Sequence, residues 1–89
     1  LKPTEAVVNS AVTREITQKQ YDALVSFTFN LGAGTFKSSD VLELTNQGNY
    51  QAAGDAILQY SHAGGEFIQG LYKRREEERA MYLSSLPQA

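Results

Sequence analysis

The sequence has 89 residues, 42% of them hydrophobic and 20% charged, a composition typical of one small globular domain. With 8 basic and 10 acidic side chains the net charge is -2, so nucleic acid has no general electrostatic reason to bind. The absence of cysteine excludes disulfides and thiolate metal sites. No apolar run approaches the ~20 residues of a membrane span, and no signal-peptide pattern opens the chain. The sequence therefore predicts neither membrane contact nor a targeting signal.

The first 15 residues read as a short helix followed by a polar connection. Lys2-Pro3-Thr4 can begin the helix, Glu5 to Val8 continue it, and Thr13-Arg14-Glu15 form a polar exit.

The next segment predicts the central helix of the domain. Thr17 is a candidate N-cap, and Gln20 three residues later completes a capping box. The residues that follow are apolar over most of the helix circumference, which is typical of an element buried on several sides. Gly32-Ala33-Gly34 then ends the helix, because glycine tolerates the backbone conformations common at helix C-termini.

Two further helices are expected between residues 38 and 60. Ser38 or Ser39 caps the first, which Asn46-Gln47-Gly48 closes, and Asn49 caps the second. Gly54 costs about 1 kcal/mol relative to alanine inside a helix, so it is expected to permit a close approach of a neighbouring helix. The inward-facing residues of the two helices are predicted to be Val41, Leu42, Leu44, Ala52, Ala53, Ala56, Ile57 and Tyr60.

The remainder predicts a loop over residues 61–65 and a last helix over residues 71–83. The charges of this helix balance at i,i+3 and i,i+4 spacing, which predicts the pairs Lys73–Glu77, Arg74–Glu78 and Glu76–Arg79 on a solvated face. Because no convincing strand is present, the predicted fold is all-α, a compact bundle of four to five short helices.

Two motifs stand out from the rest of the sequence. The first is TQKQYDALVSFTFNLGAGTF at positions 17–36. The second is a set of spaced residues, namely Tyr60, Ala63-Gly64-Gly65, Gly70-Leu71, Arg74-Arg75 and Glu78-Arg79. Both motifs resemble those of phage-type lysozymes, glycoside hydrolase family 24. The resemblance covers residues 5–83 and implies the C-terminal helical lobe of the lysozyme-like fold. It also implies that one arginine of the last helix turns inward and ties that helix to the lobe.

The resemblance divides the chain into three parts. It also implies that the catalytic residues of the family have no counterpart in this sequence. Residues 1–15 would be the remnant of the inter-lobe helix and linker, residues 16–83 the helical lobe, and residues 84–89 a C-terminal tail. The family carries its catalytic glutamate, aspartate and threonine in an N-terminal lobe, and no segment here matches those motifs. A further departure is Tyr60-Ser61, where the family has Trp-Asn. We therefore predict no catalytic residue, metal site or cofactor in this chain.

The acidic residues and the single histidine admit a structural interpretation and a catalytic one. Most acids stand at expected helix starts or on polar faces, where helix dipoles and solvent account for them. Glu66, beside Gly64-Gly65, is the carboxylate to test for chemistry, and His62 is expected to face solvent from its loop. The acidic residues are Glu5, Glu15, Asp22, Asp40, Glu43, Asp55, Glu66 and Glu76 to Glu78.

The aromatic residues are expected mainly in the core, because aromatics dominate the buried area of small domains. The resemblance nevertheless implies that some residues line a substrate cleft. The predicted substrate-binding residues are Phe29, Asn30, Ser39, Tyr60 and Ser61.

The leading hypothesis is the C-terminal lobe of a phage or prophage lysozyme, which hydrolyses the bond between N-acetylmuramic acid and N-acetylglucosamine in peptidoglycan during host lysis. On this hypothesis the chain alone is inactive. Its partners are the glycan strand and an N-terminal lysozyme lobe or a second copy, and it acts in the host cell wall, periplasm or, before lysis, cytoplasm. The alternative is a non-catalytic helical module that binds peptidoglycan or protein. A helical DNA-binding domain is a third interpretation, which the acidic balance disfavours.

Overall fold

The computed structural model describes residues 3–87 and contains six helices and one two-stranded hairpin. Lys2 of the expected helix start, and Gln88 and Ala89 of the expected tail, lie outside the described residues. No helix in residues 3–87 is long and apolar enough to cross a membrane. The elements are α1 (Thr4–Ala11), α2 (Gln18–Leu31), α3 (Ala33–Lys37), α4 (Asp40–Asn46), α5 (Tyr50–Ile57), β1 (His62–Ala63), β2 (Glu66–Phe67) and α6 (Gln69–Leu83).

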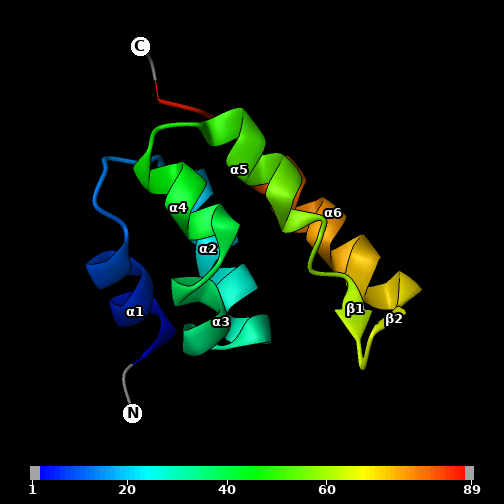
Figure 1. Ribbon diagram of the computed structural model, residues 1–89. Helices are drawn as coiled ribbons and strands as arrows, with labels where there is room; N and C mark the ends of the chain where they lie inside the picture. The colour runs from blue at the N-terminus through cyan, green and yellow to red at the C-terminus, as the bar shows by residue number, and fades with distance from the viewer. Residues whose placement is uncertain (1–2, 88–89) are drawn as a thin grey trace.

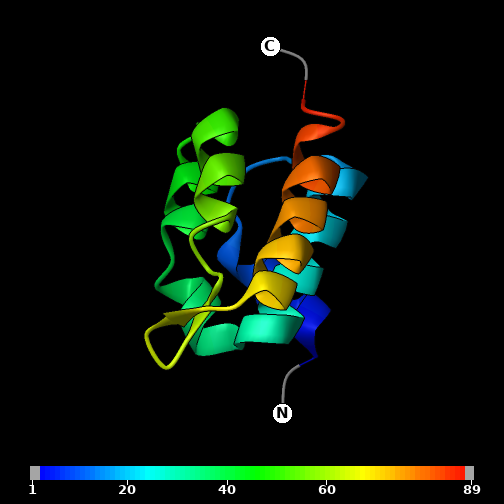
Figure 2. The same cartoon turned by 90° about the vertical axis from the view of Figure 1, so that its right-hand side faces the viewer.

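The helices are arranged in two layers, with α2 and α6 in one and α4 and α5 in the other (Figures 1 and 2). Helix α1 packs beside α2, and α5 packs against α6. Helices α2 and α6 run in opposite directions. Thr17 at the start of α2 donates from Oγ1 to the carbonyl of Ser85 beyond the end of α6 (2.6 Å), and Ser26 further along α2 contacts Glu78.

The predicted capping box at the start of α2 is confirmed. The Thr17 hydroxyl accepts a hydrogen bond from the Gln20 backbone amide (3.1 Å), and the Gln20 side-chain oxygen accepts one from the Thr17 amide (2.9 Å). Gln20 itself is buried, so this local motif also fixes where α2 enters the core.

The C-terminus of α2 is confirmed at Gly32, whose φ is +92°. The expected glycine turn over residues 32–34 is wrong in its second half, because the chain re-enters a helix at Ala33 to form α3. A single helical turn is too short to show periodicity. What stabilises it is Phe36, a fully buried ring that the turn carries into the core.

The prediction of an all-α bundle of four to five helices is confirmed in part. Residues 3–87 are mostly helical, with six helices, but residues 62–67 form an antiparallel hairpin in place of the expected loop. His62 pairs with Phe67 and Ala63 with Glu66. Gly64 and Gly65 both have positive φ, +59° and +84°, as a type I′ hairpin turn requires. Strands of two residues carry no detectable alternation, so only the Gly-Gly pair signalled the hairpin.

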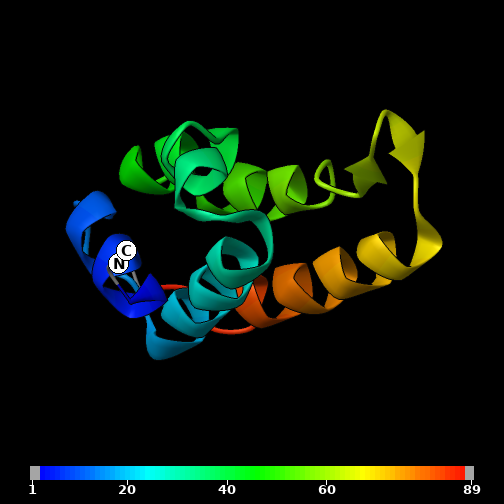
Figure 3. The same cartoon turned by 90° about the horizontal axis from the view of Figure 1, so that it is seen from below.

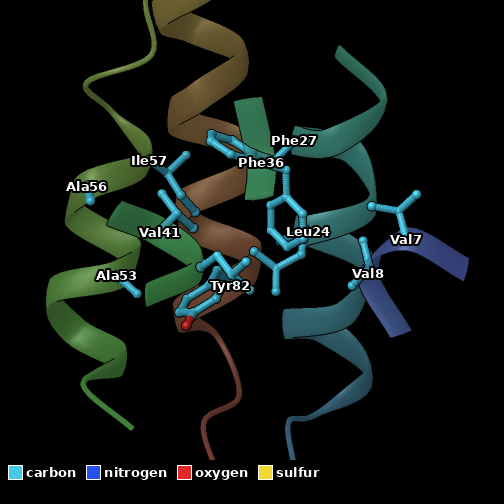
Figure 4. Packing of buried hydrophobic residues seen from close by; sticks show 12 residues of the cluster. Val7, Val8, Leu24, Phe27, Phe36, Val41, Ala53, Ala56, Ile57 and Tyr82 are labelled. Atoms are coloured by element: carbon cyan, nitrogen blue, oxygen red, sulfur yellow. The ribbon is translucent and has the colours of Figure 1, made fainter. Parts of the chain in front are cut away.

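One hydrophobic core joins all six helices (Figure 4). Helix α1 contributes Val7 and Val8, so this helix packs into the same core as the other helices. Of the residues predicted to face inward, Leu44, Ala52 and Tyr60 are only partly buried. The buried hydrophobic residues are Val7, Val8, Ala23, Leu24, Phe27, Phe36, Val41, Leu42, Ala53, Ala56, Ile57 and Tyr82.

Gly54 makes the close helix approach that the sequence predicted. A Cβ atom at this position of α5 would lie 2.8 Å from Cγ and Cδ2 of Leu83 on α6. The missing side chain therefore lets the two layers meet near the end of α6.

We expect Gly54→Ala to lower the free energy of unfolding by about 1 kcal/mol, because crowding against Leu83 outweighs the better helix propensity of alanine. In a Leu83→Ala background the same substitution becomes stabilising. Urea unfolding of the four proteins of this double-mutant cycle measures the effect.

Gly70→Ala on α6 is the matched control, because no atom lies within 4 Å of its added Cβ. It should gain up to about 1 kcal/mol. Stabilisation by Gly54→Ala in both backgrounds would contradict the close packing.

Candidate functional site

The buried ring of Phe27 on α2 is the centre of an aromatic cluster that joins four parts of the chain. Its centroid lies 6.4 Å from that of Phe36 on α3 and 5.1 Å from that of Tyr60 after α5, both in edge-on geometry. The guanidinium carbon of Arg75 on α6 lies 5.6 Å from the same centroid. Such contacts contribute about 0.5–1.5 kcal/mol each beyond burial, so Phe27 sets the spacing of these elements.

Arg75 is completely buried and pairs with Glu78, one turn later on α6. Nη2 donates to Oε2 of Glu78 (2.9 Å), and Nε lies 2.7 Å from Oε1. The hydroxyl of Ser26 on α2 donates to the same Oε2 (2.6 Å). The resulting Arg75–Glu78–Ser26 network links α6 to α2 beneath the Phe27 cluster. It confirms the expectation that one arginine of the last helix turns inward.

The electrostatics of this network are dominated by desolvation. Burial raises the pKa of the Glu78 carboxyl, while the hydrogen bond from Ser26 and the neighbouring Arg75 guanidinium oppose the rise. Arg75 Nη1 is also buried and has no hydrogen-bond partner within residues 3–87. Disrupting a buried pair of this kind is strongly destabilising, because removal of one member leaves the charge of the other buried without a partner.

None of the three ion pairs predicted on α6 forms among residues 3–87, Lys73–Glu77 included. Glu78 pairs with Arg75 rather than Arg74, and Arg79 reaches Asp55 on α5 (2.8 Å) rather than Glu76. The stripe formed by Arg75, Glu78 and Tyr82 faces the interior. Sequence reasoning therefore missed Glu78 as a buried acid. The available signal was the spacing of Arg75, Glu78 and Tyr82, which follow one another at i, i+3 and i+7 and so lie on one face of the helix.

Phe29 and Asn30, two of the predicted substrate-binding residues, lie exposed at the end of α2. The Phe29 ring is 78% exposed, although Phe27 two positions earlier is fully buried. The Asn30 side chain donates to the carbonyl of Ser26 (3.1 Å), and Ser26 also belongs to the buried network. An aromatic ring and an amide are thus presented to solvent from a rigid helix end.

Ser39, Tyr60 and Ser61 lie closer to the core, around the Phe27 cluster. The Ser39 hydroxyl accepts from the Leu42 amide, as the N-cap of α4, and donates to the carbonyl of Phe36 (2.7 Å). The Ser61 hydroxyl is likewise buried and donates to the carbonyl of Leu58 (2.7 Å). Tyr60 is partly buried against the core.

The candidate acid and histidine of the hairpin are both exposed. Glu66 stands on β2 and His62 on β1, where the His62 ring contacts Phe67. Two other acids have partners, since Asp22 accepts from Gln18 (2.8 Å) and Asp55 pairs with Arg79. Among residues 3–87, no three acidic or histidine side chains gather closely enough to hold a metal ion.

A surface groove of about 690 Å³ lies apart from these residues. Its lining includes Arg14, Ile16, Gly48, Tyr50 and Pro87, and none of the predicted site residues. The candidate site is instead the exposed end of α2 together with the Phe27 cluster beneath it, none of whose residues lines this groove.

Comparison with known families and solved structures places this helical fold among lysozyme-like proteins. The sequence model of the phage lysozyme family matches residues 1–78. The chain belongs to this family.

Individual relatives support the assignment. The endolysin of Bacillus phage B103 is 44% identical over 77 residues, 86% of this chain and 29% of the relative. The endolysin of Salmonella phage P22 is 44% identical over 84 residues, 94% of this chain and 57% of the relative. The chain thus spans between about a quarter and three-fifths of the length of these relatives.

Solved structures show the same fold. The muramidase domain of SpmX from Asticcacaulis excentricus superposes with a TM-score of 0.85 at 36% identity, covering 91% of this chain and 58% of that domain. A mutant of P22 lysozyme superposes with a TM-score of 0.82 at 43% identity, covering 89% of this chain and 53% of the lysozyme.

We expect Ser26→Ala to destabilise the protein by about 1.5–3 kcal/mol at pH 7, because a buried carboxylate loses a donor. The substitution raises the folded-state pKa of Glu78 further. A carboxyl whose folded pKa exceeds its unfolded value near 4.5 loses stability as pH rises between the two. The cost of Ser26→Ala should therefore be smaller at pH 4 and grow toward neutral pH, as urea unfolding at several pH values would measure.

Ser38→Ala is the matched control, since its hydroxyl bonds only local carbonyls on an exposed turn. Its effect should be within about 0.5 kcal/mol at every pH. A pH-independent cost at Ser26 would contradict the proposed contact with an ionised Glu78.

Proposed function

We propose that this chain forms the C-terminal helical lobe of a glycoside hydrolase family 24 lysozyme. Such an enzyme hydrolyses the bond between N-acetylmuramic acid and N-acetylglucosamine in bacterial peptidoglycan during host lysis. The observation that carries the proposal is the match of nearly the whole chain to endolysins and to a muramidase domain. The place of action proposed with it is the host cell wall or periplasm, with the host cytoplasm before lysis.

In this proposal the lobe supplies one wall of the substrate cleft, and the catalytic acid comes from an N-terminal lobe. Glycoside hydrolysis requires a proton-donating acid and a second carboxylate about 5–9.5 Å away. Here Asp55 is held by Arg79, and Glu78 is sealed beneath the surface with Arg75. The described acids therefore fit supporting roles, and the contribution of this lobe is to bind and orient the glycan.

Phe29 and Asn30 are the residues best placed for that contact. A sugar ring presents an apolar face that can pack on an aromatic ring and polar edges that can bond an amide. Phe29 offers 78% of its surface, and Asn30 extends from the same helix end. Tyr60 would form the neighbouring edge. Contact through Ser39 and Ser61 stays a prediction, and both hydroxyls already hydrogen-bond to the backbone.

A binding module without catalysis is the second candidate, and the solvent-facing Phe29 favours it. Such a module would recognise peptidoglycan or a protein, either a complementary lysozyme lobe or a second copy, through the same surface. It differs from the leading proposal in one respect, since it would add no cleavage when joined to a catalytic lobe.

We expect the isolated chain to leave peptidoglycan intact, and a chimera in which it replaces the matched segment of P22 endolysin to cleave it. The reason is that the fold and the cleft wall are shared while the acid lies in the retained part. Reducing-sugar release and turbidity loss on purified peptidoglycan measure the activity. In the chimera, Phe29→Ala should lower kcat/KM roughly tenfold.

Met81→Ala provides the control, because Met81 is an exposed apolar residue of α6 outside the proposed wall. A folded but inactive chimera would favour the binding module. Cleavage by the isolated chain that disappears in Glu66→Gln would show that the catalytic acid lies in the hairpin.

A further inference from the structure

The β1–β2 hairpin lies at one end of the molecule, next to the start of α6 (Figures 1 and 3). Two rings of the hairpin and one ring of α6 form a group there. We call these residues, His62, Phe67 and Tyr72, the hairpin ring cluster. The Phe67 centroid lies 5.8 Å from that of His62 at an interplanar angle of 75°, and 5.5 Å from that of Tyr72 at 51°. Phe67 is nevertheless 52% exposed, and Ile68 beside it is 38% exposed.

The cluster is held in place without being part of the core. The hairpin register sets His62 opposite Phe67, which puts their side chains on one face of the ribbon. The amide of Ile68 donates to the carbonyl of Ser61 (2.9 Å) and closes the base of the hairpin. Tyr72 comes from the first turn of α6. About half of the Phe67 side chain stays in solvent, so its burial contributes less to the free energy of folding than that of a core ring. An exposed ring held in a fixed position is well suited to contact a ligand.

We propose that the hairpin ring cluster is a second glycan-binding site, which packs Phe67 against the apolar face of an N-acetylated hexose. Aromatic rings present a flat face of negative potential that suits polarised C–H groups. The ring nitrogens of His62 and the hydroxyl of Tyr72 supply polar groups at its edge. Glu66 pairs with Ala63 and so extends from the opposite face of the ribbon, which leaves the stacking face without a carboxylate.

The cluster is continuous with the wall of the cleft proposed above, and the inference rests on that proposed function. The Ile68–Ser61 hydrogen bond joins the hairpin to Tyr60-Ser61, and the Tyr60 ring packs on Phe27. A glycan chain lying along the Tyr60-Ser61 edge would therefore reach Phe67 as it leaves the cleft. The site would strengthen attachment to the wall without contacting the bond that is cleaved.

Calorimetric titration of the 89-residue chain with chitotetraose, a glycan free of stem peptides, tests the inference. We expect Phe67→Ala to weaken binding on the order of tenfold, and Phe67→Tyr to retain it because the ring face is preserved. Met81→Ala, which removes a comparably exposed apolar side chain elsewhere on α6, should leave binding unchanged. All variants should remain folded at the temperature of the titration, since none of the substituted side chains belongs to the core. Phe67→Ala should lower the melting temperature by a small amount, because its contacts with His62 and Tyr72 are lost.

Three results would overturn the inference. The first is failure of the unaltered chain to bind chitotetraose. The second is binding by Phe67→Ala that stays within twofold of it, or an equal loss in Met81→Ala, which would indicate non-specific adsorption. The third is an effect of Phe67→Ala on intact peptidoglycan with none on chitotetraose, which would assign the cluster to a stem peptide.

The P22 chimera separates this inference from the proposed function. One outcome would refute the second site alone. In it, Phe67→Ala changes neither the cleavage of peptidoglycan by the chimera nor the binding of chitotetraose by the 89-residue chain, while the chimera is active. Another outcome would refute the proposed lysozyme function alone. In it, the chimera is folded but inactive, while the 89-residue chain binds chitotetraose and Phe67→Ala weakens that binding.

Discussion

The contact between the Arg75 guanidinium and the buried ring of Phe27 is the interaction on which the arrangement of the helices depends. An arginine removed from water must be compensated on several sides. Here the ring covers one side, while Glu78 supplies the opposite charge and is itself held by Ser26. Because Phe27 also packs on α3 and Tyr60, a single compensated charge joins α2, α3, α6 and the segment after α5.

This interior has a direct consequence for the surface. Phe29 and Asn30 follow Phe27 on the same helix end, so the network that fixes Phe27 also fixes the direction in which they face solvent. The Asn30 side chain even bonds the carbonyl of Ser26. Binding groups mounted on a rigid scaffold lose little conformational entropy when they meet a ligand. The orientation of the exposed Phe29 and Asn30 side chains thus depends on a polar network buried beneath them.

Local sequence signals predicted the elements whose stabilising groups lie a few residues apart. The side chains of Thr17 and Gln20 each accept a hydrogen bond from the other residue's backbone amide, and Gly32 ends α2. Gly54 marks the close approach of α6. Signals shorter than a helical turn failed. The five residues of α3 are helical because Phe36 is buried, and the hairpin depends on two adjacent glycines. The family resemblance implied the exposure of Phe29, and the capping role of Ser39 was one of two alternatives offered by the sequence. The internal hydrogen bond of Ser61 was visible only in the packed structure.

By itself the sequence determined the helical class, the limits of the longer helices and membership of the phage lysozyme family, because propensity, capping and motif spacing are encoded between near neighbours. The tertiary structure decided which charges are buried. Arg74 and Arg75 are adjacent and chemically identical, yet only Arg75 faces Phe27, and Arg79 finds Asp55 across the interface with α5. That choice is made by burial against partners 24 to 52 positions away, whose positions exist only once the helices have packed.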